Sequence, residues 1–283
     1  MFKLVSISIL ASVAAMGIVP HEGEPLAQGF ENRVRGILPR NQTLDGDEPQ
    51  PRFFGIFDED WEFYDYVTET ISSWLEQKTL VAAGFVSDPY PYEFGSDAFK
   101  VQIHDAECYV VVQATDSLSD WISNVQFFKS NYYYDGHYVG TAHSGFVDAY
   151  NTFAATGMHE MVNRLCSNVN HINFVGHSRG AAIATLLATS YHVHSRFTVD
   201  LFTFGAPRIL EDASSDLFHR AFTQVRVMNN DDPVTATMGL YGKHFGLVVC
   251  LNCRETERDS SENGNPLNHK MTNYLGTIKK VFG

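Results

Sequence analysis

GHSRG, residues 176–180, has the form G-x-S-x-G, and the residues on both sides of it have the patterns of a strand and a helix. The strand pattern is INFV at residues 172–175, and the helix pattern is AAIATLLA at residues 181–188. A serine on a sharp strand-to-helix turn presents its hydroxyl at the carboxyl end of a sheet, and the start of the helix directs backbone N–H groups to the same point. The pattern predicts a nucleophile, Ser178; the alternative is a small-residue turn in an unrelated α/β protein.

Strand-like runs alternate with helix-length patterns along the chain. Further strands are expected at residues 109–112, 199–204 and 225–228, and helical periodicity covers residues 145–166 and 179–192. Strands separated by helices imply βαβ units and a mostly parallel sheet with helices on both faces. Residues 99–103 are expected to form a hairpin with the first of these strands across residues 105–107. The expected architecture is an α/β-hydrolase fold in a single catalytic domain, residues 53–283.

The start of the chain has the layout of a secretory signal in residues 1–17. Lys3 precedes an apolar run at residues 4–15, and small residues follow it. The run is too short to span a bilayer, which takes about 20 residues; a buried N-terminal helix is the alternative. Residues 18–52 are rich in Pro, Gly and charge, which indicates a flexible leader or pro-segment. The sequence therefore predicts a secreted, extracellular protein without a transmembrane segment.

The bulk composition excludes some classes of protein. A chain of 283 residues with 44% apolar and 13% aromatic residues can bury a core, so global disorder is excluded. The formal net charge of -13 makes nucleic acid an unsuitable partner, because binding phosphates needs clustered Lys and Arg. The four cysteines are an even number in a secreted chain, so one or two disulfides are expected, with the pairing left open. They are Cys108, Cys166, Cys250 and Cys253.

An oxyanion hole and a lid are expected next to the serine. Acyl transfer needs preorganised donors for the oxyanion, and the backbone N–H of Arg179 and that of Thr115, after the strand at 109–112, are the candidates. The segment that follows Thr115 has apolar residues at i, i+3, i+4 and i+7, as in an amphipathic helix. They are Leu118, Trp121, Ile122 and Val125. The functional interpretation is a lid over the pocket; the alternative is an ordinary surface helix.

From about residue 60 to its end, the chain resembles the class 3 lipases, the family of the fungal triacylglycerol lipases. The motifs that carry the resemblance are VVVQAT (110–115) with SDW (119–121), AHSGF (142–146), GHSRG (176–180), FGAPR (204–208), RVMNNDDPV (226–234) and HKMTNYL (269–275). The resemblance implies an α/β-hydrolase fold and a triad of Ser178, Asp232 and His269. Two positions depart from the family pattern: Gln113-Ala114 replaces Arg-Gly, and Arg179 replaces Leu.

The acid and the base each have a competitor when the residues are considered without the family. Asp231 is adjacent to Asp232, and either follows the strand at 225–228. His244 competes with His269, because both lie beyond the acid, as the α/β-hydrolase order requires. We prefer His269 as the base and expect His244 to shape a pocket or pack a loop.

Two other histidines lie within motifs. His177 adjoins the nucleophile but cannot easily turn back onto its hydroxyl, so a structural role is expected. His143, in AHSGF, is expected to be a positioning residue beneath the site.

These features predict a secreted serine esterase or lipase that hydrolyses carboxylic esters of lipids such as acylglycerols through an acyl-enzyme. Its partner is a lipid or other ester substrate, including one at a lipid–water interface. No metal and no organic cofactor is required. Phospholipase and short-acyl or feruloyl esterase activities use the same machinery and remain open. A catalytically silent lipase-like binding or signalling protein is the alternative from another class.

Overall fold

A computed structural model of the chain describes residues 53–54, 76–88, 92–94, 97–114, 128–219, 221–237, 242, 244–251 and 264–282. Residues 51–55 and 78–283 cluster into one compact unit, which holds all the labelled helices and strands. The predicted signal and leader segments and the predicted lid lie outside the described residues. Each helix in the described ranges is too short or too polar to cross a bilayer.

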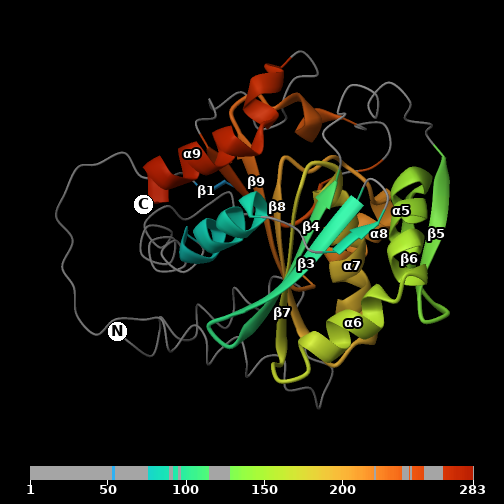
Figure 1. Cartoon of the computed structure of the whole chain (residues 1–283). Coiled ribbons are helices and arrows are strands. Elements are labelled where there is room, and N and C mark those ends of the chain that lie inside the picture. The colour runs from blue at the N-terminus through green and yellow to red at the C-terminus, as the bar shows by residue number, and fades with distance from the viewer. Residues whose placement is uncertain are drawn as a thin grey trace, which may run out of the picture. The chain divides into compact units, whose positions relative to one another are not determined.

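Eight strands of the described residues form the central sheet (Figure 1). In spatial order they are β1 (Phe53–Phe54), β10 (Leu247–Leu251), β9 (Thr223–Asn229), β8 (Thr198–Phe204), β7 (His171–His177), β4 (Glu107–Ala114), β3 (Asp97–His104) and β2 (Tyr92–Phe94). The run β10-β9-β8-β7-β4 is parallel, whereas β1, β3 and β2 pair antiparallel with their neighbours. The strands expected at residues 109–112, 172–175, 199–204 and 225–228 are confirmed as β4, β7, β8 and β9.

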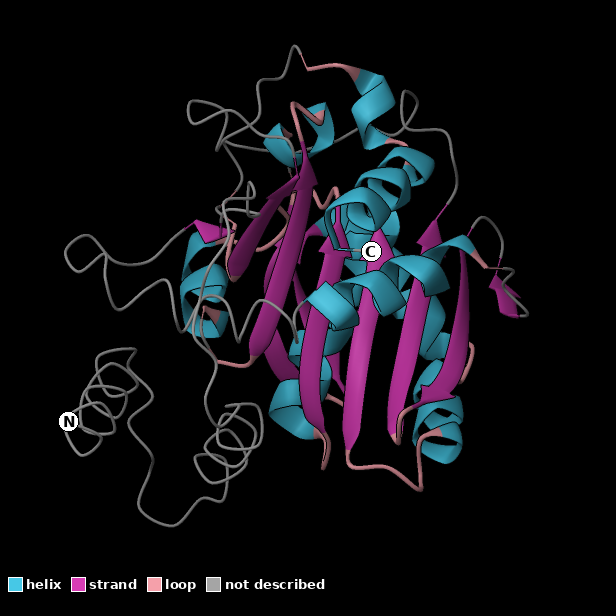
Figure 2. Cartoon of the chain, turned by 90° about the vertical axis from the view of Figure 1, so that its left-hand side faces the viewer, coloured by secondary structure: helices cyan, strands magenta, loops and turns pink. Residues whose placement is uncertain are grey.

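Helices cover both faces of this sheet, as Figure 2 shows. The labelled helices are α5 (Ser144–Ala155), α6 (Met158–Leu165), α7 (Arg179–His194), α8 (Asp212–Phe218) and α9 (Met271–Phe282), with short 3-10 helices η1 (Pro233–Ala236) and η2 (Pro266–His269); residues 76–87 are also helical. α7 packs on β7, β8 and β4, and its residues 180–191 are all buried. Because both faces are covered, the inner strands β7, β8 and β9 are buried along nearly their whole length. The expected mostly parallel sheet flanked by helices is confirmed.

The helical pattern at residues 145–166 forms two helices, α5 and α6, rather than one. Gly157 lies between them with φ of 79°, in the left-handed region, and serves as the N-cap of α6. A left-handed residue cannot continue a right-handed helix, so the chain changes direction there. The predicted hairpin is confirmed as β3–β4, with Asp105 and Ala106 in the turn and Glu107 already paired with His104.

A second sheet of two strands, β5 (Lys129–Tyr134) and β6 (His137–His143), stands apart from the central sheet beside α5 (Figure 1). The sequence patterns did not predict this sheet. The turn between the strands contains Asp135 at φ of 48° and Gly136 at φ of 78°. Ala142 of β6 makes a bridge to Leu210, so the hairpin is tied to the segment that follows β8.

One disulfide joins Cys108 of β4 to Cys166, which caps the end of α6. Both residues are fully buried, and their Cα atoms lie 5.7 Å apart. The bond closes a loop across a sequence separation of 58 residues. One of the disulfides expected from the cysteine count is therefore present, whereas the side chains of the other two cysteines lie outside the described residues.

A cluster of charged side chains lies at the amino ends of the parallel strands. Lys78, in the helical segment before β2, contacts Glu107 of β4 and lies 3.2 Å from the Asn173 side chain and 3.8 Å from Asp200 Oδ2. His171 Nε2 lies 2.9 Å from Asp200 Oδ2. Burial opposes the ionisation of Glu107, but the hydrogen bond and charge of Lys78, aided by His171 and Asn173, lower its pKa below the ordinary value. This cluster fastens the helical segment to the base of the sheet.

Candidate active site

Ser178 occupies the sharp turn predicted between a strand and a helix. β7 ends at His177 and α7 begins at Arg179, while Ser178 has φ of 57° and ψ of −128°. This conformation is strained for a residue with a Cβ, and strain of this kind concentrates at functional sites. The Ser178 N–H donates to the carbonyl of Phe204 at 2.9 Å, which ties the turn to the end of β8. A Cβ at Gly176 would collide with the backbone of Gly180, so the first glycine of the pentapeptide is required by the close approach of strand and helix.

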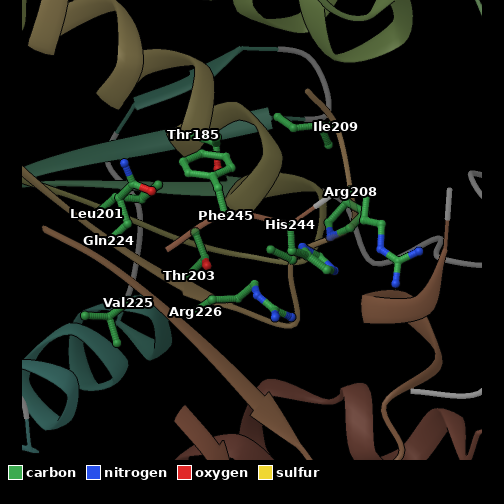
Figure 3. A pocket seen from close by; sticks show the side chains of 12 residues that line it. Thr185, Leu201, Thr203, Arg208, Ile209, Gln224, Val225, Arg226, His244 and Phe245 are labelled. Atoms are coloured by element: carbon green, nitrogen blue, oxygen red, sulfur yellow. The ribbon is translucent and has the colours of Figure 1, made fainter. Parts of the chain in front are cut away.

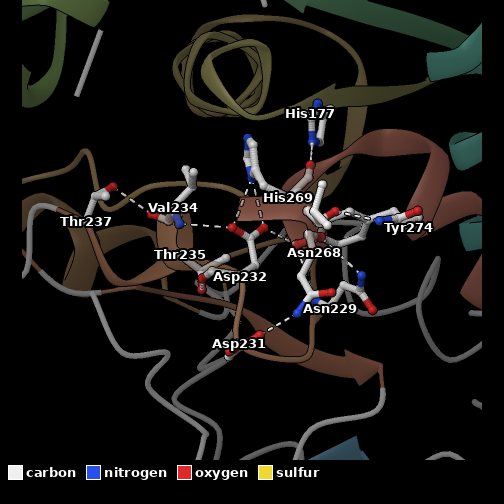
Figure 4. Close-up of polar contacts among 12 residues, drawn as sticks. His177, Asn229, Asp231, Asp232, Val234, Thr235, Thr237, Asn268, His269 and Tyr274 are labelled. Carbon is white, nitrogen blue, oxygen red and sulfur yellow. Dashed lines mark hydrogen bonds and ion pairs between the residues drawn. The ribbon is translucent and has the colours of Figure 1, made fainter. Parts of the chain in front are cut away.

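Asp232 and His269 meet at the carboxyl end of β9. Nδ1 of His269 lies 3.0 Å from Oδ1 and 2.9 Å from Oδ2 of the fully buried Asp232 carboxylate (Figure 4). The same carboxylate accepts hydrogen bonds from the backbone N–H of Val234 at 2.9 Å and from the hydroxyl of Tyr274 at 2.5 Å. Because an ionised carboxylate only accepts, Nδ1 of His269 carries the proton and Nε2 has a free lone pair.

Nε2 of His269 is the atom that this tautomer leaves available. It is buried, and within the described part of the chain it has no hydrogen-bond partner. In Figure 4 this nitrogen points away from the carboxylate that holds the opposite side of the ring. An oriented imidazole with an open Nε2 is the arrangement that a general base requires.

The backbone after β8 connects the serine turn to this pair. Phe204 accepts the hydrogen bond from Ser178, and the next residue, Gly205, has φ of 58°. A Cβ on Gly205 would lie 2.7 Å from Oδ2 of Asp232 and 2.9 Å from Nδ1 of His269. The structure thus brings Ser178, Asp232 and His269 to one edge of the parallel sheet, at the carboxyl ends of β7, β8 and β9.

Tyr274 also belongs to the site, although the sequence patterns did not indicate it. It lies on α9, is fully buried, and its hydroxyl accepts a hydrogen bond from the Asn229 N–H at 3.2 Å while donating to Asp232. Burial, together with the Asp232 charge, raises the pKa of Tyr274 well above the ordinary value, so the hydroxyl remains a donor. The HKMTNYL motif contains Tyr274, but only packing shows that its side chain reaches the carboxylate.

Asp231 has a different set of contacts from its neighbour. Its Oδ2 accepts from the Asn265 N–H at 3.2 Å, and its Oδ1 accepts from the Asn268 side chain. Asp231 therefore ties down the loop that leads into His269 and does not contact the imidazole. The geometry favours Asp232 over Asp231 as the acid.

His244 faces a backbone carbonyl rather than a carboxylate. Its Nε2 donates to the carbonyl of Thr235 at 2.7 Å, and it lies between Arg226 and Arg208 in Figure 3. Burial, reinforced by these two charges, lowers the pKa of His244 well below the ordinary value. The side chain lines a pocket with residues of α7, β8 and β9. The described lining residues are Thr185, Leu201, Thr203, Ala206, Pro207, Arg208, Ile209, Gln224, Val225, Arg226, His244 and Phe245.

The remaining predicted site residues are placed as follows. Arg179 is the first residue of α7, so its backbone N–H belongs to the first turn beside Ser178. His143 accepts a hydrogen bond from the Gly145 N–H at 3.2 Å and caps α5. The oxyanion candidate Thr115 and the lid candidates Leu118, Trp121, Ile122 and Val125 lie outside the described residues. No cluster of three or more His, Cys, Asp or Glu side chains suited to a metal ion occurs in the described ranges.

Comparison with known proteins gives a match over the segment that holds the serine turn. Residues 109–242 match the family described as Lipase (class 3). The secreted mono- and diacylglycerol lipase 1 of Fusarium solani is 32% identical over 135 residues, which are 45% of this chain and 38% of that protein. The chain thus spans less than half the length of this relative.

Solved structures share the fold at low sequence identity. The triacylglyceride lipase of Rhizomucor miehei superposes with a TM-score of 0.55 at 18% identity, over 70% of this chain and 82% of that one. A triacylglycerol lipase with a serine protease triad as its catalytic centre superposes with a TM-score of 0.55 at 18% identity, over 71% of this chain and 93% of that one. These neighbours establish the α/β-hydrolase fold. Residues 109–242 of this chain thus match the class 3 lipase family in sequence, and the described chain shares its fold with solved fungal lipases.

Proposed function

We propose that this chain is a secreted serine hydrolase that cleaves carboxylic esters of lipids, and that acylglycerols are its main substrates. The observation that carries the proposal is the Asp232–His269 pair with its open Nε2, beside the strained Ser178 turn. A triad is recognised by its geometry and roles, and the proposal is supported by a buried carboxylate, an oriented imidazole and a serine that occur in the α/β-hydrolase order.

The proposed reaction has two steps. Nε2 of His269 takes the proton of the Ser178 hydroxyl as Oγ attacks the ester carbonyl carbon. Asp232 stabilises the imidazolium, which then protonates the departing alcohol as the C–O bond of the ester breaks. His269 then takes a proton from water as the water oxygen attacks the acyl-enzyme carbonyl carbon, and it returns that proton to Ser178 Oγ as the bond between Oγ and the acyl carbon breaks and the carboxylic acid leaves.

The oxyanion of each tetrahedral intermediate needs donors in fixed positions. We assign the backbone N–H groups of Arg179 and Thr115 to this role. Arg179 is supported by its place in the first turn of α7, where backbone N–H groups and the helix dipole favour negative charge. Thr115 is supported by its position immediately after β4, the neighbour of β7 in the sheet.

The substrate class is supported by the named relatives. The Fusarium solani protein is a secreted mono- and diacylglycerol lipase, and the Rhizomucor miehei structure is a triacylglyceride lipase. Secretion of this chain is supported by the same relative, by the signal-like residues 1–17 and by the buried disulfide, which is typical of oxidising compartments. We further propose that residues 18–52 form a leader, that residues 53–283 are the catalytic domain, and that residues 118–125 form a lid.

A fluorophosphonate probe, which labels activated serines, tests the function directly. We expect the wild-type protein to be labelled and Ser178→Ala to remain unlabelled, while hydrolysis of acylglycerols is lost in parallel. Folded wild-type protein that takes no label and hydrolyses neither acylglycerols, phospholipid nor p-nitrophenyl esters would make it a binding protein instead. For the lid, a rate that does not rise when the substrate passes from monomers to an emulsion would count against interfacial opening.

A further inference from the structure

His177 is in contact with the residue proposed as the base. Its Nε2 lies 2.6 Å from the backbone carbonyl oxygen of His269 (Figure 4), and the two imidazole rings stack with centroids 4.6 Å apart and planes at 29°. The ring of Tyr274 meets His177 edge-on at 5.9 Å. One side chain therefore touches both the backbone and the ring of His269.

The hydrogen bond to the His269 carbonyl determines which ring nitrogen of His177 carries a hydrogen. A carbonyl oxygen only accepts, so Nε2 of His177 must carry the hydrogen. Burial, reinforced by the charge of His269, lowers the pKa of His177 to about 4, against the smaller opposing effects of its backbone hydrogen bond and Asp232. Near neutral pH the ring is thus uncharged, and it places no like charge against His269 when that residue accepts a proton.

We infer that His177 is a positioning residue for the proposed hydrolysis, which holds the backbone and ring of His269 at a fixed distance from Ser178. The inference rests on the proposed function. His177 and Ser178 are consecutive residues at the end of β7, so any displacement of the serine turn is shared by both. Through its bond to the His269 carbonyl, His177 ties the segment carrying the base to the strand carrying the nucleophile.

Two anchors then define the position of Nε2 of His269. Asp232 holds the ring at Nδ1, and His177 holds the backbone from which the ring extends. With only the first anchor, the ring can pivot about the carboxylate and change its distance from the serine hydroxyl. A misplacement of 1 Å can cost about 100-fold in rate. The loss should fall on kcat, because His177 itself touches no substrate atom in the proposed reaction.

Three substitutions separate the hydrogen bond from the ring stack. His177→Gln places an amide N–H close to the position of Nε2 and removes the ring, whereas His177→Phe keeps a ring and removes the donor. In His177→Asn the side chain is too short for its amide to reach the His269 carbonyl. His192→Phe is a matched control, because His192 is another partly buried histidine of the described chain, with its ring tilted against that of Phe222 at a centroid distance of 4.9 Å and outside the site.

The measurements are kcat and KM on a soluble ester, with the fluorophosphonate labelling rate and the thermal midpoint of each variant. We expect His177→Phe and His177→Asn to lose about 10- to 100-fold in kcat with KM nearly unchanged. His177→Gln should recover most of the activity, and His192→Phe should stay within about twofold of wild type.

Wild-type kcat in folded His177→Phe, or an equal loss in His177→Gln and His177→Phe, would overturn the inference while leaving the proposed function intact. If His177→Phe does not fold, the comparison of His177→Gln with His177→Asn decides the question in the same way. A wild-type protein with no activity would instead refute the proposed function.

Discussion

Nδ1 of His269 lies within 3.0 Å of both carboxylate oxygens of Asp232, although the two residues are separated by 37 positions in the chain. This contact fixes which ring nitrogen carries the proton. We expect Asp232→Asn to lower kcat by about four orders of magnitude, because an amide in this place favours the wrong tautomer of the base.

The matched control for this substitution is Asp231→Asn. The carboxylate of Asp231 accepts hydrogen bonds from Asn265 and Asn268. Its loss should loosen the loop that leads into His269 and reduce activity far less than Asp232→Asn does. Initial rates on a p-nitrophenyl ester distinguish the two. A larger loss in Asp231→Asn than in Asp232→Asn would show that the acid has been assigned to the wrong residue.

Tyr274→Phe should lower the free energy of unfolding by about 1.5–3 kcal/mol, the range for hydrogen bonds to charged groups. The substitution removes the donor at 2.5 Å from Asp232 and leaves a buried charge with one partner fewer. Urea unfolding at neutral pH measures this change in the free energy of unfolding. Tyr138→Phe is the control, because that hydroxyl is exposed and bonds only Thr141 in the described structure; equal effects would contradict the importance of the Tyr274 contact.

Gly205→Ala should damage both stability and activity. The residue has φ of 58°, and an added Cβ would lie 2.7 Å from Oδ2 of Asp232 and 2.9 Å from Nδ1 of His269, so both side chains must move away from this position. The left-handed conformation alone costs about 1–2 kcal/mol for a residue with a Cβ. Gly276→Ala, on α9 with open space around it, should instead stabilise the protein by about 0.5–1 kcal/mol. Thermal midpoints and kcat of both variants test the contrast.

The double variant Cys108→Ala/Cys166→Ala should be less stable than wild type by about 4 kcal/mol in urea, as expected for opening a loop of this length. The separation of 58 residues sets the entropy that the crosslink removes from the unfolded chain. If the double variant and the wild type unfold at the same urea concentration, the crosslink does not form in the folded protein.

Stability should fall in acid partly through Glu107. Its folded-state pKa is lowered from 4.5, so its contribution is present above that value and is lost as the pH falls through the lower, folded-state pKa. We expect Glu107→Gln to flatten the dependence of the free energy of unfolding on pH below about 4.5. An unchanged slope in that range would contradict the coupling to Lys78. Lys78→Met should remove this acid-dependent loss, because burial, the largest influence on Glu107, then raises its pKa without the opposing hydrogen bond and charge of Lys78.

Local patterns identified the elements that carry the site. The alternation of strands and helices follows from residue patterns within short stretches of the chain. For this reason β7, α7 and the turn at Ser178 were predictable. The helix break at Gly157 was not, because a glycine inside a helical pattern is often tolerated and its left-handed conformation depends on how α5 and α6 pack. The hairpin β5–β6 was also missed, since its register depends on packing beside α5.

By itself the sequence determined an α/β fold with a serine on a strained turn, because short-range periodicity and the need for glycine at a close approach are local properties. The resemblance to the class 3 lipases already favoured Asp232 over its neighbour, but only the tertiary structure showed that His269 contacts it and brought Tyr274 and His177 against this pair. Those choices depend on contacts of 2.5–3.0 Å between residues tens of positions apart, which packing alone decides.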